Sequence, residues 1–471
     1  MARLMKRLTW RTTAQTLGCY HNIHVFLLLF LMLFLKPCTV QLALSASTVD
    51  FLPGFSGSLP FQLETGYVGV GESEELQLFY YFVKSERNPE KDPLLIWLTG
   101  GPGCSSWSGL VYEVGPVRYR IEPYNGSLPT LVLNPYSWTK ISSIVFVDSP
   151  VGTGFSYAKT SSASEVGDLK QVQGLFQFFK KWLTDHPEFM LNPIYIAGDS
   201  YSGITVPILV QQISNGIEES ILPPINLQGY ILGNPATGRD NNYKIPFAHG
   251  MALISDELYK SLEKNCGGEY YENIDPSNIE CLEEFQAFQK SVLGIWSKFI
   301  LDSDCNSASS KSQEDSISGR RLLNQNFEVI RSSESLLSQF GCPDYPELLS
   351  NYWANDPDVR QALHVRKGSV GEWKRCNYGF PYERNVRSSV EYHANLSAKG
   401  YRSLIYSGDH DMQVPFLATQ AWIRSLNYSI VDEWRSWVVQ GQVAGYTRTY
   451  SNRMTFATVR ARKSFPFLFS F

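Results

Sequence analysis

The chain has 471 residues, of which 43% are hydrophobic and 14% aromatic. This composition excludes intrinsic disorder and collagen-like or low-complexity scaffolds, which carry too few apolar side chains to form a core. The 41 Lys and Arg against 45 Asp and Glu give a net charge of −4, which argues against a nucleic-acid-binding protein. At ~150 residues per domain the length would suggest three domains, but we expect one large catalytic domain elaborated by insertions.

The first 46 residues have the layout of an export signal. Basic side chains precede an apolar run from Val25 to Leu35, and Ala43-Leu44-Ser45 offers small residues for cleavage. The run of 11 residues is short for a bilayer core, which needs ~20 apolar residues. Residues 1–46 are therefore predicted to be a secretory signal peptide, so the mature protein would be extracellular or vacuolar and free of the membrane. An uncleaved membrane anchor is the alternative.

The cysteines support the same compartment. Cys19 and Cys38 lie in the predicted signal, which leaves six in the mature chain: Cys104, Cys266, Cys281, Cys305, Cys342 and Cys376. Six cysteines in an exported protein indicate three disulfides, for which the sequence allows 15 connectivities. Their spacing does not resemble a zinc pattern, and no metal or cofactor is predicted. Sequons for N-glycosylation begin at Asn125, Asn395 and Asn427.

Short β-branched runs alternate with helical patterns along the chain. This alternation predicts an α/β fold with a mainly parallel sheet and helices on both faces. Apolar side chains from Leu169 to Leu183 recur at steps of three and four, which predicts an amphipathic crossover helix. The predicted strands are Leu94–Leu98, Ile144–Val147, Ile194–Ala197, Leu227–Leu232, Ser403–Ser407 and Met454–Val459.

The strand pattern is interrupted in the middle of the chain. We expect a core in two parts, residues 47–235 and 376–471, separated by an insertion at 236–375 that has little strand character and is stapled by disulfides. Within the insertion, residues 306–324 are rich in Ser and charge. They predict an exposed loop with a possible processing site at Arg320.

A candidate nucleophile lies in Gly198-Asp199-Ser200-Tyr201-Ser202-Gly203, between a predicted strand and a predicted helix. A serine on such a sharp turn is held clear of the sheet, and neighbouring backbone N–H groups can stabilise an oxyanion. The strict nucleophile-elbow pattern has Gly where Ser202 stands. Taken alone, the motif therefore leaves an ordinary turn serine as an open alternative.

Several longer motifs in order raise the specificity. Between about Val49 and Val459, the chain closely resembles the plant serine carboxypeptidase-like family. The motifs that carry the likeness are Trp97–Ser106, Asp148–Tyr157, Gly198–Gly203, Gly233–Pro235 and Gly408–Asp411. The resemblance implies an α/β-hydrolase fold with a helical, disulfide-stapled insertion and a Ser-Asp-His triad in that chain order.

The resemblance also implies roles for individual residues. Ser200 corresponds to the nucleophile and Asp411 to the triad acid, while the backbone N–H groups of Gly101 and Tyr201 correspond to the oxyanion hole. A glycine at position 101 suits this role because it lets the backbone approach a substrate closely. The implied disulfides are Cys104–Cys376, Cys266–Cys281 and Cys305–Cys342.

Four positions bear on the substrate: Trp97, Thr99, Glu113 and Asp199. They correspond to the family's network for the substrate carboxylate, but Thr99 replaces Asn and Asp199 replaces Glu. Both replacements resemble the branch that transfers acyl groups from glucose esters, so acyl transfer is the favoured activity. The predicted partners are a small-molecule acyl donor and acceptor. Carboxypeptidase action on a peptide C-terminus is the alternative, and both activities use a seryl acyl-enzyme.

The predicted triad lacks its base. The chain has seven histidines, and none follows Asp411. In the family the base follows the last strand in a Gly-rich loop, whereas this chain continues after Val459 into an atypical Phe-rich tail at 460–471. The chain is therefore predicted to be inactive or weakly active. It is either a shortened form of an enzyme or a non-catalytic, ligand-binding pseudoenzyme.

Overall fold

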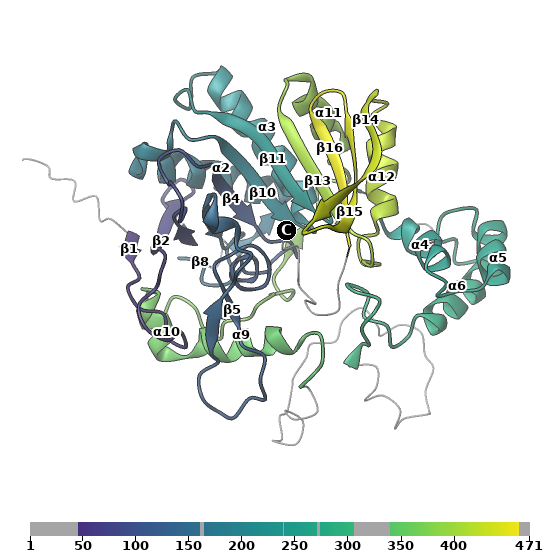
Figure 1. Ribbon diagram of the computed structural model, residues 1–471, viewed down its shortest axis with the longest axis horizontal. Helices are drawn as coiled ribbons and strands as arrows, with labels where there is room; N and C mark the ends of the chain where they lie inside the picture. The colour runs from purple at the N-terminus through teal and green to yellow at the C-terminus, as the bar shows by residue number, and fades with distance from the viewer. Residues whose placement is uncertain (1–45, 161–163, 239, 271–273, 306–339, 461–471) are drawn as a thin grey trace, which may run out of the picture. The chain divides into compact units, whose positions relative to one another are not determined.

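The computed structural model describes residues 46–160, 164–238, 240–270, 274–305 and 340–460. The predicted signal peptide up to Ser45, the loop at 306–324 and the tail beyond Arg460 therefore lie outside the described residues. The described chain is built on a 12-stranded sheet (Figure 1). In order across the sheet, its main path is β1 (Ala46–Thr48), β2 (Leu63–Val70), β3 (Leu76–Val83), β7 (Ser143–Val147), β4 (Leu94–Leu98), β10 (Ile194–Asp199), β11 (Leu227–Gly233), β13 (Arg402–Gly408), β16 (Met454–Val459), β15 (Gln442–Tyr450) and β14 (Ile430–Val439).

The centre and the edges of this sheet differ in direction. From β7 to β16 the neighbouring strands are parallel. The strands outside this block pair antiparallel, β1 to β3 on one side and β15 and β14 on the other. The short strand β8 (Tyr157–Ala158) pairs with β3 off the main path. The α/β class with a mainly parallel centre is confirmed, while the antiparallel flanks were not predicted.

The central strands are apolar on both faces, as strands covered by helices on both sides must be. In β4, Leu94, Ile96 and Leu98 belong to one core cluster, whereas Leu95 and Trp97 belong to a second cluster on the opposite face. Successive side chains of a strand point to opposite faces, so five consecutive apolar residues fill both cores. All five residues of β4 are therefore apolar and buried.

Helices cover the sheet and complete these two cores. The first core receives α2 (Asp168–Asp185), α3 (Ser202–Glu218), α11 (Val390–Ala398) and α12 (Phe416–Ser425). The second receives α9 (Tyr345–Asn355) and α10 (Pro357–Ala362). There the rings of Trp107 and Trp353 stack with centroids 4.3 Å apart, which contributes stabilisation beyond the area they bury.

The described part of the 236–375 region is helical. It contains α4 (Lys244–Gly250), α5 (Asp256–Cys266) and α6 (Ile279–Ser291), in addition to α9 and α10. The α4–α6 helices contribute Ile245, Phe247, Leu262 and Phe288 to a small apolar cluster that also contains Met412. Two short two-stranded sheets complete the fold: β5 (Val117–Tyr119) with β6 (Leu131–Leu133), and β9 (Val166–Gly167) with β12 (Tyr382–Glu383).

Candidate active site

Ser200 lies on a tight turn between β10 and α3. Its φ of 53° is in the left-handed region, which a non-glycine residue rarely adopts. Backbone hydrogen bonds hold this conformation, because the Ser200 N–H donates to the Gly233 carbonyl at 2.9 Å and its carbonyl accepts from Gly203 at 3.0 Å and from Ala236 at 2.9 Å. The strained turn presents Ser200 to a cavity of about 420 Å³. This is the backbone geometry of a nucleophile elbow, which exposes a serine hydroxyl between a strand and a helix.

A glycine turn after β4 lies against this serine. A Cβ on Gly100 would come within 2.6 Å of the Tyr201 nitrogen and 2.8 Å of the Ser200 Cβ, so only glycine allows the approach. Gly101, with φ 119°, lines the cavity. Within the described chain, neither the Gly101 nor the Tyr201 N–H donates to another protein group. Two such free donors beside a serine are able to stabilise an oxyanion.

Asp411 lies after β13 and lines the same cavity. Its Oδ2 accepts from Asn234 Nδ2 at 2.6 Å, and its Oδ1 accepts from the N–H groups of Gln413 at 2.6 Å and Val414 at 3.1 Å. Burial raises the pKa of the carboxyl to about 7. Ser200, Asn234 and Asp411 follow the neighbouring strands β10, β11 and β13, so the carboxyl ends of the sheet bring them together.

The described histidines do not complete a triad. The five are His186, His249, His364, His393 and His410. Among them His410 lines the cavity, but its Nδ1 is hydrogen-bonded to Asp409 Oδ1 at 2.5 Å. In residues 46–460, outside the masked gaps, no histidine hydrogen-bonds to Ser200 or Asp411. The described part of the site therefore holds the Ser200 hydroxyl and the Asp411 carboxyl without an imidazole joining them.

The floor of the cavity carries two acids that the sequence singled out. The Asp199 Oδ1 accepts from the Gly100 N–H at 3.2 Å, and burial raises the Asp199 pKa to about 6. Burial, followed by the nearby Asp199 charge, raises the pKa of Glu113 well above its ordinary value. Glu113 Oε2 is buried without a hydrogen-bond partner in the described chain. A protonated acid there could donate a hydrogen bond to a substrate.

The other two predicted binding residues have different positions. Thr99 lines the cavity together with Glu113 and Asp199. Trp97 does not line it, because its ring is fully buried in the core. The Trp97 Nε1 donates to Thr99 Oγ1 at 3.3 Å, so the buried tryptophan holds the threonine hydroxyl through a hydrogen bond.

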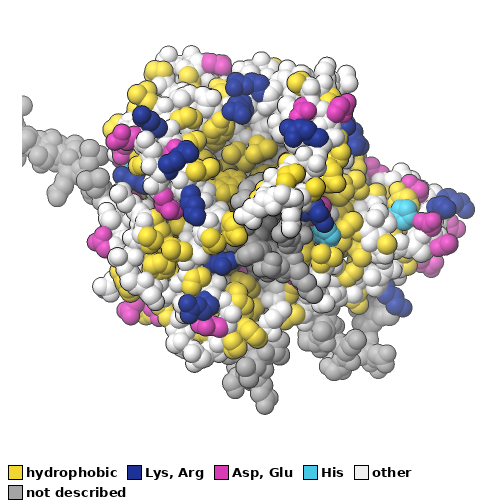
Figure 2. Space-filling model, in the orientation of Figure 1, with side chains coloured by type: hydrophobic (Ala, Val, Ile, Leu, Met, Phe, Trp, Pro, Cys, Tyr) yellow, Lys and Arg dark blue, Asp and Glu magenta, His cyan; other side chains and the backbone are white. Residues whose placement is uncertain are grey.

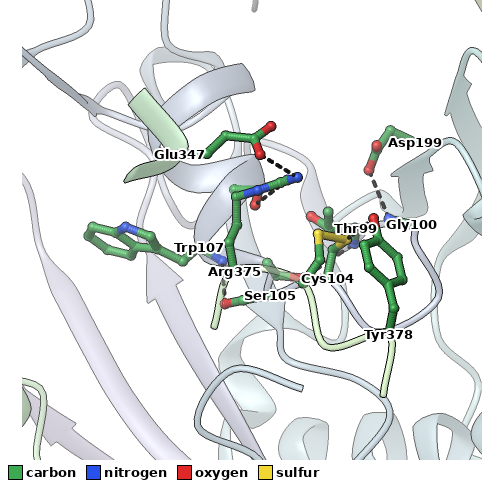
Figure 3. The surroundings of a disulfide bond; sticks show 12 residues. Thr99, Gly100, Cys104, Ser105, Trp107, Asp199, Glu347, Arg375 and Tyr378 are labelled. Atoms are coloured by element: carbon green, nitrogen blue, oxygen red, sulfur yellow. Dashed lines mark hydrogen bonds and ion pairs between the residues drawn. A yellow bond between two sulfur atoms is a disulfide. The ribbon is translucent and has the colours of Figure 1, made fainter. Parts of the chain in front are cut away.

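Sequence reasoning missed a group of charged residues on the cavity wall. Arg375 Nη2 lies 2.9 Å from Glu347 Oε2, and Lys298 Nζ lies 3.2 Å from Glu347 Oε1. All three line the cavity, although they come from separate segments. Figure 3 shows the Arg375–Glu347 pair close to the Thr99-Gly100 turn. No motif marks these residues. One signal was available for Arg375: it directly precedes Cys376, whose implied disulfide partner Cys104 follows the glycine turn.

The structure contains the three disulfides that the family resemblance implies: Cys104–Cys376, Cys266–Cys281 and Cys305–Cys342. The first joins residues 272 apart in sequence and ties the glycine turn to the segment after Arg375 (Figure 3). The second joins the end of α5 to α6. Three disulfides fit a protein of an oxidising compartment.

Four further findings concern the sequons, the surface charge, membrane spans and metal ligands. Asn125, Asn395 and Asn427 are all exposed, so their glycosylation remains a sterically open prediction. In the view of Figure 2, basic and acidic side chains of the described residues are interspersed, without one large basic patch. Across the described ranges, no helix is long and apolar enough to span a bilayer, and no cluster of three potential metal ligands occurs.

Comparison with known proteins decides the family. The family model described as serine carboxypeptidase matches residues 53–462. The chain belongs to the serine carboxypeptidase family. Two relatives from Arabidopsis thaliana support this: serine carboxypeptidase-like 5 is 54% identical over 418 residues, covering 88% of each chain, and serine carboxypeptidase-like 2 is 54% identical over 434 residues, covering 92% of this chain and 91% of the relative.

A solved structure supports the α/β-hydrolase fold of this serine carboxypeptidase-like chain. Kex1, a prohormone-processing carboxypeptidase from Saccharomyces cerevisiae, superposes with a TM-score of 0.64, covering 86% of this chain and 88% of that one. Its sequence identity is 20%, so this likeness concerns the fold alone. The family assignment and the fold predicted from the sequence are both confirmed.

Proposed function

We propose that this chain carries a seryl acyl-transfer site in which Ser200 forms an acyl-enzyme. The observation that carries the proposal is Ser200 on a positive-φ turn against the Gly100-Gly101 turn, in one cavity with Asp411. The Ser200 oxygen attacks an ester carbonyl and its proton passes to water, while the carbonyl oxygen becomes an oxyanion beside the Gly101 and Tyr201 N–H groups. The oxyanion then collapses, the C–O bond to the leaving group breaks, and that oxygen takes a proton from water and departs as the alcohol. An acceptor hydroxyl or water then takes the acyl group.

The favoured donor is a glucose ester of a phenolic acid, and the favoured acceptor is an alcohol. Thr99 and Asp199 support this choice, because their short side chains leave room where a longer amide and acid would hold a peptide carboxylate. One observation favours the alternative, a carboxypeptidase reaction. Since the pKa values of Asp199 and Glu113 are raised, at mildly acidic pH both acids could donate hydrogen bonds to a peptide's terminal carboxylate.

We further propose that turnover is slow in the 471-residue chain, because no histidine of the described residues is hydrogen-bonded to Ser200. A serine hydroxyl is a weak nucleophile unless a positioned group accepts its proton. No histidine follows Asp411 in the sequence, and among the described residues His410 is hydrogen-bonded to Asp409 and not to Ser200. The protein would act on its substrates after export through the secretory pathway, either in the vacuole or outside the cell, where the three disulfides are stable.

A side-by-side assay tests both activities. The purified chain is incubated with a phenolic acid glucose ester plus an alcohol, and separately with a blocked dipeptide, and products are measured by mass spectrometry. We expect slow, Ser200-dependent formation of the transferred ester that is lost in Ser200→Ala. Turnover that survives this substitution, or peptide cleavage that exceeds ester transfer, contradicts the proposal. Turnover at ordinary enzyme rates contradicts the missing base.

A further inference from the structure

Asp168, the first residue of α2, has a fully buried side chain in contact with the nucleophile turn. Its Oδ1 accepts from the Tyr201 hydroxyl at 2.7 Å and from the Tyr382 hydroxyl at 2.9 Å. Its Oδ2 accepts from the Val386 N–H at 2.9 Å. One carboxylate therefore joins the residue after the nucleophile to a distant segment of the chain.

That segment, residues 376–389, is here called the strap. It begins at the glycine turn, where Cys376 forms its disulfide with Cys104 and the Asn377 N–H donates to the Gly103 carbonyl at 2.9 Å. It ends at the nucleophile helix, where Ser389 Oγ donates to the Gly203 carbonyl at 2.6 Å. The strap thus connects the two turns that carry the predicted oxyanion donors, and Asp168 holds its middle.

The chemistry of this contact favours fixed geometry. A buried carboxylate is costly unless its oxygens accept hydrogen bonds, and here both are occupied. Burial and then the Asp168 hydrogen bond raise the pKa of Tyr201, so its hydroxyl stays protonated as the donor. Arg384 lies over the Tyr201 ring, 5.8 Å from its centroid, and brings a positive charge to the same place. The Tyr201 side chain is therefore fixed from several directions.

We propose that Asp168 is a positioning residue for the oxyanion hole. Acting through Tyr201 and the strap, it sets the spacing between the Tyr201 and Gly101 N–H groups. This inference rests on the proposed function, in which those two groups stabilise the oxyanion. Such donors must be held to within ~0.5 Å, and loss of one donor costs ~10²- to 10³-fold in rate. A displaced donor should therefore cost about 10-fold or more.

A boronic acid tests this without needing rapid turnover. Phenylboronic acid accepts an oxygen lone pair from Ser200, the hydroxyl proton passes to solvent, and the tetrahedral anion that forms resembles the reaction intermediate. In the full chain, we expect Asp168→Asn to weaken phenylboronate binding about 10-fold, with unchanged binding of unreactive phenyl β-glucoside. Tyr201→Phe, which removes only the hydroxyl, should act in the same direction. The matched control is Asp185→Asn, at the exposed end of the same helix.

Amide hydrogen exchange provides a second measurement that does not depend on the reaction. We expect faster exchange in peptides covering Gly100–Gly103 and Tyr201–Gly203 for Asp168→Asn, but not for Asp185→Asn. Equal exchange and equal boronate affinity overturn the inference. If boronate binding of the parent chain survives Ser200→Ala, the proposed function fails while exchange still decides the role of Asp168. Should Asp168→Asn not fold, Tyr201→Phe decides the result.

Discussion

Ser200 and Asp411 lie on two sides of the cavity, and both are held firmly by the surrounding chain, but the described residues do not connect them. On the nucleophile side, Ser200 has a strained backbone, three backbone hydrogen bonds and a glycine turn packed against it. On the acid side, Asp411 is equally well held by three hydrogen bonds, yet no described imidazole connects it to the serine. The difference teaches that orienting a nucleophile and activating it are separate requirements, because orientation is achieved by the local fold and activation needs a further group.

Supplying the missing group should have the largest effect. Residues 460–471 would be replaced by a segment with a histidine in a glycine-rich loop, the arrangement that the family resemblance implies. We expect Ser200-dependent ester turnover to rise ~10³-fold or more, since a triad base contributes at least this much. The measurement is the rate with a phenolic glucose ester. The same segment with alanine for the histidine is the control, and equal rates for the two would show that the acid side lacks something else.

The cavity floor offers a smaller effect on specificity. Thr99→Asn combined with Asp199→Glu lengthens both groups toward the substrate, so a peptide carboxylate should be held better. We expect the ratio of peptide hydrolysis to acyl transfer to rise ~10-fold, measured in the histidine-bearing variant. Thr99→Ser keeps a short hydroxyl and should leave the ratio unchanged. The interpretation of these two positions is wrong if the double variant behaves like Thr99→Ser.

Asp199 also predicts a pH dependence of stability. Burial raises its pKa to about 6 in the folded chain, above ~4 for an unfolded aspartate. The stabilisation from the protonated acid is therefore complete below pH ~4 and is lost as the pH rises through 6. In urea unfolding, Asp199→Asn should lose less free energy of unfolding between pH 4 and 7 than the parent chain, by about 1 to 3 kcal/mol. Parallel curves, like those expected for Asp185→Asn, would contradict this.

The glycan sites should give the smallest effect. Asn125, Asn395 and Asn427 are exposed, so their substitution by Gln should remove one glycan each from protein secreted by plant cells. We expect three stepwise mass losses and a change in unfolding free energy within about 0.5 kcal/mol. Intact-mass spectrometry and thermal unfolding provide the readouts. An unchanged mass for any variant would show that its sequon is not used.

Much of the core was predictable because its pattern is local. The buried run Leu94–Leu98 coincides with β4, and the apolar periodicity between Leu169 and Leu183 lies within α2. The antiparallel hairpin of β14 and β15 was missed. Most β14 side chains are exposed and its pairing is interrupted by bulges, so neither a continuous nor a strictly alternating apolar pattern marks it.

The site divides in the same way. Ser200, Gly101 and Asp411 lie in recognisable turns after strands, and the structure brings them to one cavity. Arg375, Glu347 and Lys298 share no motif or spacing, and their ion pairs exist because parts of the 236–375 region that lie far apart in sequence meet at the cavity. The role of Asp168 could likewise not be predicted from the sequence, since its partners Tyr201 and Tyr382 lie 33 and 214 residues away.

By itself, the sequence determined the family, the strained serine turn and the absence of a histidine after Asp411, because each depends on the identity and order of neighbouring residues. Only the tertiary structure decided which charges line the cavity, that Trp97 donates to Thr99, and that Asp168 accepts hydrogen bonds from Tyr201 and Tyr382. Burial, pKa and long-range hydrogen bonds depend on which distant segments meet, and one-dimensional spacing does not encode them.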